Sequence, residues 1–106
     1  MDEREFETLA ERTLRGYLAR IEDALDVDVD LLGGILSIEL DDGRQYVLNK
    51  HAPNRQLWLS SPLSGASHYS YDPATGGWRS TRGGAALADL LATELAQLTG
   101  AELTFD

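Results

Sequence analysis

The sequence predicts an α+β fold, a two-layer α-β sandwich in which two helices pack on one face of an antiparallel sheet. Three observations carry this prediction: a helical apolar stripe near each end of the chain, alternating apolar and polar residues between them, and no repeat or linker. The other face of such a sheet is left to solvent. A chain of 106 residues with 42% hydrophobic content supports one core, so we expect a single domain over residues 1–106.

The first helix is predicted over residues 3 to 25. Apolar and small side chains recur there at spacings of three and four, the stripe of an amphipathic helix: Phe6, Leu9, Ala10, Thr13, Leu14, Tyr17, Leu18, Ile21 and Leu25. The same helix carries a row of glutamates with arginines at pairing distance: Glu3, Glu7 and Glu11, with Arg4, Arg12 and Arg15.

A run of antiparallel strands is predicted for the middle of the chain. Residues 26 to 31 alternate strictly, with three aspartates on the outward face and apolar residues on the other. Further strands are expected over residues 36 to 41, 45 to 49, 56 to 61, 67 to 72 and 78 to 80, separated by turns rich in glycine, aspartate and proline.

The second helix is predicted over residues 85 to 98. Its stripe consists of leucines, and Gly100 is a typical residue to close it: Leu87, Leu90, Leu91, Leu95 and Leu98. In the tail that follows, residues 101 to 106, we expect Leu103 and Phe105 to pack late against the core.

Several common classes of site are not supported by the sequence. Without cysteine the chain has no disulfide, thiolate zinc site or cluster-holding thiolates, so any metal must sit on oxygen or imidazole ligands. The three glycine pairs lack a nucleotide-binding spacing, and no serine lies in a hydrolase elbow. His51 and His68 are interpreted as a loop residue and a strand surface residue, and the sequence does not say whether they come near each other.

Negative charge is concentrated at the start of the chain. Residues 1–42 hold 13 acidic and 4 basic residues, a net charge of −9, whereas residues 43–106 hold 5 of each. Such a surface repels nucleic acid and anionic lipid and attracts cations and basic proteins. No apolar run approaches the ~20 residues that span a bilayer, and the first five residues are too acidic for a signal peptide. We therefore expect a bacterial cytoplasmic protein with no nucleic-acid or membrane partner.

An acidic cluster is the first candidate site. It combines the end of the first helix with the outward face of the next strand: Glu22, Asp23, Asp26, Asp28 and Asp30. Carboxylates at a helix C-terminus face the negative end of its dipole, and alternate strand residues repel one another at ~6.5 to 7 Å. A hard or borderline cation such as Mg²⁺, Ca²⁺, Mn²⁺ or iron would relieve that repulsion at an open, weak site. The alternative interpretation is a solvated acidic face that only aids solubility.

A second candidate surface surrounds Trp58. If Leu57 and Leu59 point into the core, the pleat places Gln56 and Trp58 on the open face, near Asn49. An exposed indole among polar residues is typical of a protein-binding hot spot. The alternative is a tryptophan covered by a loop.

The sequence resembles the frataxin family, including its bacterial CyaY-type members. The central segments carry the resemblance, with YVLNK at residues 46–50 and PNRQLWLSSPLSG at residues 53–65, and they are closer to the mitochondrial form than to many bacterial ones. GILSI at residues 34–38, Trp78 and LADLLATEL at residues 87–95 extend it over nearly the whole chain. The resemblance implies the frataxin-like α-β sandwich. Mitochondrial members often carry a basic residue where this chain has His68, and a histidine where it has Arg82.

The resemblance also implies functions for the two candidate surfaces. It implies weak binding of Fe²⁺ and Fe³⁺ and contact with a cysteine desulfurase at the acidic residues, here Glu22, Asp23, Asp26, Asp28 and Asp30. It implies that Asn49, Gln56 and Trp58 face the desulfurase and the iron–sulfur scaffold protein. The leading hypothesis is an iron-binding regulator of iron–sulfur cluster assembly, a monomer that can form an iron-dependent oligomer. The alternatives are a ferroxidase that stores iron and a simple iron chaperone, and the sequence does not distinguish activation from inhibition.

Overall fold

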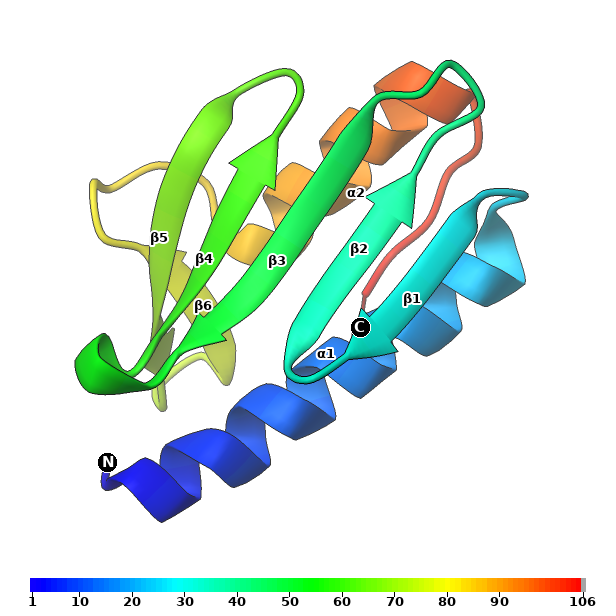
Figure 1. Ribbon diagram of the computed structural model, residues 1–106. Coiled ribbons are helices and arrows are strands. Elements are labelled where there is room, and N and C mark those ends of the chain that lie inside the picture. Colours follow the sequence, from blue (N-terminus) through cyan, green and yellow to red (C-terminus); the bar gives the residue numbers. More distant parts are fainter. Residues whose placement is uncertain (106) are drawn as a thin grey trace.

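The computed structural model describes residues 1–105 and confirms a two-layer sandwich of helices and sheet. Both helices lie behind a six-stranded antiparallel sheet, whose other face is open (Figure 1). The elements are α1 (Glu3–Ala24), β1 (Asp28–Leu32), β2 (Ile35–Glu39), β3 (Gln45–His51), the short 3₁₀ helix η1 (Ala52–Asn54), β4 (Gln56–Ser61), β5 (Gly65–Asp72), β6 (Gly77–Ser80) and α2 (Leu87–Thr99). Asp106, the last residue of the predicted tail, lies outside the described residues.

Helix α1 begins and ends where its sequence supplies caps. The Asp2 carboxylate accepts a hydrogen bond of 2.8 Å from the Glu5 backbone N–H, which satisfies one of the free donors of the first turn. At the other end Leu25 turns to extended backbone, while its N–H still donates to the Ile21 carbonyl. Neither helix of the described chain is both long enough and apolar enough to cross a membrane.

The sheet is a simple meander in which each strand pairs with the next along the chain. The β1–β2 hairpin is the tightest turn, because Leu32 pairs with Ile35 and only two glycines lie between them. Gly33 and Gly34 have φ values of +61° and +79°, as a two-residue primed turn requires. A Cβ on Gly34 would also meet the flexible side chain of Lys50, which would have to move to make room.

The core lies between the helices and the inner face of the sheet. Strands β2 to β6 contribute inward-facing residues and each helix contributes its stripe, and these side chains are almost fully buried: Phe6, Leu14, Ile21, Leu36, Ile38, Tyr46, Leu48, Leu57, Leu59, Tyr69, Trp78, Leu87, Leu91 and Leu95. Val29 and Leu31 of β1 are partly buried against this core. The predicted packing of Leu103 and Phe105 is confirmed, since both lie against this core and the Phe105 ring is 4.5 Å from that of Tyr17.

One buried position of α2 is charged. Glu94 lies on the leucine stripe, where its Oε1 accepts hydrogen bonds from the Tyr46 hydroxyl at 2.7 Å and the Ser61 hydroxyl at 2.5 Å. The Ser61 hydroxyl in turn accepts from the backbone N–H groups of Leu63 and Ser64. Glu94 therefore fixes the turn between β4 and β5, and with it the register of that hairpin.

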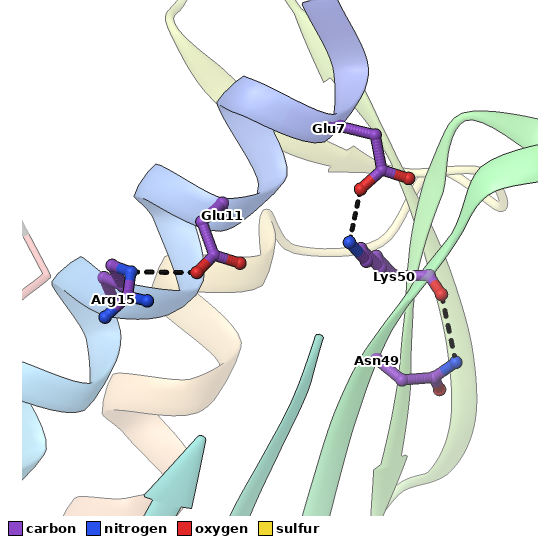
Figure 2. A network of polar contacts seen from close by, with 5 residues as sticks. All are labelled: Glu7, Glu11, Arg15, Asn49 and Lys50. Atoms are coloured by element: carbon purple, nitrogen blue, oxygen red, sulfur yellow. Dashed lines mark hydrogen bonds and ion pairs between the residues drawn. The ribbon is translucent and has the colours of Figure 1, made fainter. Parts of the chain in front are cut away.

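The glutamate row of α1 is satisfied partly along the helix and partly across the fold. Arg15 pairs with Glu11 at 2.8 Å, as the helical spacing predicts. Glu7 instead binds Lys50 of β3, the single lysine of the chain, on the inner side of the sheet (Figure 2). This ion pair ties the N-terminal half of α1 to the middle of the sheet.

The predicted start of the first strand is wrong by two residues. Asp26 lies in the connection between α1 and β1, because pairing begins only at Asp28, opposite Glu39, the last residue of β2. The connection is held by Leu25, whose buried side chain keeps the chain close to the core before it enters the sheet. Asp28 and Asp30 do lie on the outward face of β1, as predicted.

Candidate functional site

The acidic ridge is formed by Glu22 and Asp23 at the end of α1, Asp26 in the connection, and Asp28 and Asp30 on β1. All five side chains are exposed. The last turn of α1 contains no basic residue, so the negative end of the helix dipole meets carboxylates without a compensating charge. The ridge is therefore a surface of unrelieved negative potential along one edge of the sandwich.

Two further aspartates lie beside the ridge. A cavity of about 460 Å³ separates the α1–β1 connection from the β2–β3 turn and the end of α2, and Asp26, Asp41 and Asp42 line it. Asp42 is neutralised locally, since Arg44 lies 2.6 Å from its carboxylate, and the hydrogen bonds from Arg44 hold the pKa of Asp42 below its usual value. Asp41 extends the negative surface, which sequence spacing did not indicate because the turn lies on another hairpin.

The ridge offers separate carboxylates and not a closed cage. Within residues 1–105, no three histidine, aspartate or glutamate side chains lie close enough together to hold a metal ion. The oxygen donors fit hard or borderline cations chemically. A cation would be shared among exposed side chains and water, so the arrangement is suited to weak binding.

The tryptophan patch, which we define as Asn49, Gln56 and Trp58, lies on the open face of the sheet. Asn49 and Trp58 are directly opposite in the β3–β4 pairing, and the Trp58 Nε1–H donates to Gln56 Oε1 at 2.8 Å. The sequence therefore placed these three side chains together correctly. The indole itself is half-buried where full exposure was expected.

Two histidines account for this burial. His51 of β3 and His68 of β5 flank β4 on either side, and their imidazoles stack on the Trp58 indole with centroid distances of 3.8 and 4.2 Å. The ring planes are parallel to within 7° and 9°. We call this arrangement, His51, Trp58 and His68, the aromatic stack.

Sequence reasoning assigned no role to either histidine, although a glutamate on the apolar stripe of α2 was a clue to the strand pairing that brings His68 to Trp58. Trp58 pairs directly with His68 only because the β4–β5 turn spans residues 62 to 64, and the buried Glu94 sets that turn. Glu94 could itself have been found, since it stands three residues after Leu91 on the apolar stripe of α2.

Asp28 and Asp30 of the ridge share the open face of the sheet with the patch, whereas Glu22 and Asp23 belong to α1, which packs on the other face. A continuous cross-strand row runs from Leu32 through Ile35, Asn49 and Trp58 to His68. Leu32 is 75% exposed and Ile35 is 44% exposed, so the row begins with apolar side chains in water. Asp30 precedes Leu32 by two residues and points to the same side. One partner could therefore contact both surfaces at once.

The family model and the similar known proteins agree on one family. The frataxin-like domain model matches residues 1–101. The chain is 40% identical to mitochondrial frataxin of Arabidopsis thaliana, over 94% of this chain but only 57% of that relative. It is 33% identical to the iron-sulfur cluster assembly protein CyaY of Pseudomonas fluorescens, over 100% of this chain and 96% of that protein.

Solved structures agree with this result. Frataxin from Psychromonas ingrahamii is similar with a TM-score of 0.90 and 27% identity, covering 100% of this chain and 99% of the other. A trimeric frataxin from the yeast Saccharomyces cerevisiae, complexed with ferrous iron, gives a TM-score of 0.74 and 34% identity over 87% of this chain and 86% of the other.

Proposed function

The chain belongs to the frataxin-like domain family, and from that premise we propose that it is an iron-binding regulator of iron–sulfur cluster assembly. It binds the cysteine desulfurase and scaffold complex, with iron held weakly at the acidic ridge. The observation that carries this proposal is the open face of the sheet, which presents Asp28 and Asp30 of the ridge on β1 and the tryptophan patch on β3 and β4. The names of the CyaY relatives support the process.

The ridge supports two of the proposed roles. Its five exposed carboxylates, Glu22, Asp23, Asp26, Asp28 and Asp30, supply oxygen ligands for Fe²⁺ or Fe³⁺. The same negative potential attracts a basic surface, which we assign to the desulfurase. Because both ligands neutralise the same charge, we expect iron and desulfurase to influence each other's binding at this edge.

The tryptophan patch supports docking to the assembled complex. A half-buried indole held by Gln56 on a rigid sheet loses little conformational entropy on contact with a partner, and such rings dominate binding energy at interfaces. Leu32 and Ile35 add exposed apolar area in the same row. Together they provide an apolar centre with a charged rim at the ridge.

The open geometry of the ridge favours a regulator over a ferroxidase. A di-iron oxidation centre needs carboxylates and histidines that converge from several elements. In the described part of the chain no group of three such side chains does so. A simple chaperone would need only the ridge, whereas the tryptophan patch gives the chain a second means of acting on the complex.

We further propose that residues 1–106 act as a single domain in the bacterial cytoplasm, as a monomer that can oligomerise with iron. The bacterial CyaY relatives, of nearly the same length, support the compartment and the one-domain organisation. The trimeric yeast frataxin with ferrous iron supports oligomerisation as an accessible state. Nucleic acid and membranes are not expected partners of so acidic a surface.

Charge neutralisation of the ridge tests the proposal. In Asp26→Asn/Asp28→Asn/Asp30→Asn, an anaerobic ¹H–¹⁵N correlation titration with Fe²⁺ should no longer broaden signals of residues 22–30. The affinity for a bacterial cysteine desulfurase should fall at least tenfold, because three charges facing a basic surface are removed. The same variant should lose most of the salt dependence of desulfurase binding.

A matched control removes the same number of charges elsewhere. Glu3→Gln/Glu5→Gln/Asp89→Asn changes three exposed acids at the starts of α1 and α2, away from the ridge, so it should retain both iron broadening and desulfurase affinity. If the ridge variant and this control behave alike, net charge and not the ridge is responsible, and the proposed iron site and desulfurase contact are both incorrect.

A further inference from the structure

The aromatic stack holds Trp58 in one orientation from three sides. His51 and His68 cover its two faces, and Gln56 accepts a hydrogen bond from its indole N–H. The indole edge is what remains available to a partner. The two histidines therefore determine how the central side chain of the tryptophan patch is presented.

Among the described residues, those directly opposite or next to the two histidines on the open face carry no carboxylate; Asp72, four residues after His68 on the same face of β5, pairs with Arg79. Opposite or beside the two histidines lie the neutral residues Asn49, Gln56, Ser70 and Thr81. The Nδ1 atom of His51 is buried and has no hydrogen-bond partner. A proton added to either ring would find no acceptor of opposite charge among these neighbours.

The charged groups nearest to the stack are two arginines, and the other charged groups lie further away or on the opposite side of the sheet. Arg79 of β6 lies diagonally from His68 and pairs with Asp72 at 3.5 Å, and Arg55 follows the short helix after His51. Lys50 points to the opposite side of the sheet, where it binds Glu7. Asp30, the nearest carboxylate of the ridge on this face, is on β1, two strands from β3.

We infer that His51 and His68 are positioning residues for Trp58 and make docking of this face depend on pH, with an uncharged, largely apolar strip of the assembly complex as the occupant. The inference rests on the proposed function. With both imidazoles neutral, the row from Leu32 to His68 carries no charge and matches such a strip. Protonation of the histidines places one or two positive charges beside Trp58, at one end of this row.

The sign of the effect follows from desolvation. Docking covers the stack, and removing an unpaired charge from water is costly, so the docked state favours neutral imidazoles. Docking must therefore release any bound protons, and affinity falls as the pH falls through the range in which histidine gains its charge. Each imidazole that must give up a proton on docking adds to this loss of affinity at acid pH.

The free protein provides the first test. The Trp58 indole N–H signal in ¹H–¹⁵N spectra should shift between pH 8 and pH 5.5, because protonation occurs in rings stacked on it. The Trp78 indole N–H donates to Thr13 Oγ1 inside the core and should stay unchanged as an internal reference. An invariant Trp58 signal would show that the stack does not sense protons, and would overturn the pH dependence.

Two double variants separate positioning from charge. His51→Phe/His68→Phe keeps two rings on the indole but cannot gain a proton, whereas His51→Gln/His68→Gln removes the rings as well. The dissociation constant for a bacterial desulfurase–scaffold complex would be measured at pH 8 and pH 5.5 by calorimetry. Between pH 8 and pH 5.5, we expect the affinity of wild type to fall at least about tenfold further than the affinity of the Phe variant. At pH 8 the Gln variant should bind at least about threefold more weakly than the Phe variant, because its indole is no longer held.

Each of these binding results tests a separate part of the inference. Equal acid dependence in wild type and the Phe variant would overturn the role of charge, because the remaining dependence would belong to the partner. Equal affinity of the Phe and Gln variants at pH 8 would overturn the positioning role. Failure of wild type to bind at pH 8 would instead refute the proposed docking function, while the indole signal of the free protein still decides whether the stack senses protons.

Discussion

The two tryptophans of this chain lie in the same sheet but on opposite faces. Trp78 of β6 faces the helices, is 4% exposed, and donates its indole N–H to Thr13 Oγ1 of α1 at 3.0 Å. Trp58 of β4 faces outward and donates to Gln56, two residues earlier on its own strand. The partner of the inner indole thus comes from another layer of the fold, whereas the outer indole is held from within the sheet.

Their aromatic neighbours differ in the same way. Trp78 meets Phe6 and Tyr71 edge to face, at interplanar angles of 79° and 64°. Trp58 is stacked with His51 and His68 at less than 10°. Edge-to-face rings fill a core in three dimensions, while parallel rings leave their edges free. Tryptophan therefore packs the core on the inner face of the sheet and offers its edge to a partner on the outer face.

The largest expected effect comes from truncating each indole in turn. Trp78→Ala should reduce the free energy of unfolding by about 3–5 kcal/mol, because it leaves a cavity against α1 and removes the hydrogen bond to Thr13 Oγ1. Trp58→Ala should cost less than about 1.5 kcal/mol but weaken binding to the desulfurase–scaffold complex about thirtyfold, as for an interface hot spot. Urea unfolding and calorimetric binding measure both, and Trp78→Phe serves where the alanine variant does not fold. Equal stability losses at the two sites would break the comparison.

The inner face should be sensitive to alkali. Burial raises the pKa of Tyr17, with a further contribution from Asp89, and burial together with the Glu94 hydrogen bond raises that of Tyr46. Both folded pKa values lie above the unfolded one, so the folded state retains protons that the unfolded state loses above about pH 10. Stability should fall as the pH rises beyond that point, by about 1.4 kcal/mol per pH unit for each tyrosine.

Urea unfolding between pH 9 and pH 11 checks this slope. Tyr46→Phe removes one titrating hydroxyl and should flatten the decline by about half. A variant with the full wild-type slope would show that Tyr46 does not contribute, and would limit the alkaline sensitivity to Tyr17.

The smallest effects concern the two indole hydrogen bonds. Thr13→Val is nearly isosteric but leaves the Trp78 N–H without its acceptor inside the core, which should cost about 1 kcal/mol. Gln56→Leu removes the acceptor of Trp58 at a half-exposed site where water can replace it, so stability should change by less than about 0.5 kcal/mol. Thermal unfolding of the two variants side by side tests this difference, and a larger loss for Gln56→Leu would contradict it.

Local sequence patterns were enough to predict the helices and strands, but not all of the residues at which they begin and end. The stripes of residues 3–25 and 85–98 predicted α1 and α2, and the alternation of residues 56–61 predicted β4 as observed. The start of β1 was misplaced because Asp26 and Val27 continue the alternation of the strand without a partner strand opposite them. Alternation reports which side chains face the core, whereas a strand begins where a neighbour supplies hydrogen bonds.

For the candidate site, the residues of the ridge were adjacent in sequence and could be grouped from spacing alone, as could Gln56 and Trp58. His51 and His68 could not, because each reaches Trp58 from a different strand, β3 or β5, on either side of β4. Asp41 reaches the ridge from a separate hairpin in the same manner. Their proximity depends on turn lengths and register, which no local pattern contains.

The sequence by itself determined the fold class, the face on which each strand residue lies and the charged edge of the molecule. These properties follow from hydrophobic periodicity and composition, which act over a few residues. Only the tertiary structure decided that two imidazoles enclose Trp58, that Lys50 reaches Glu7, and that Glu94 is buried beneath the β4–β5 turn. Those contacts join residues that are far apart in the sequence, either between a helix and the sheet or between neighbouring strands, and their geometry is fixed only when the whole core closes.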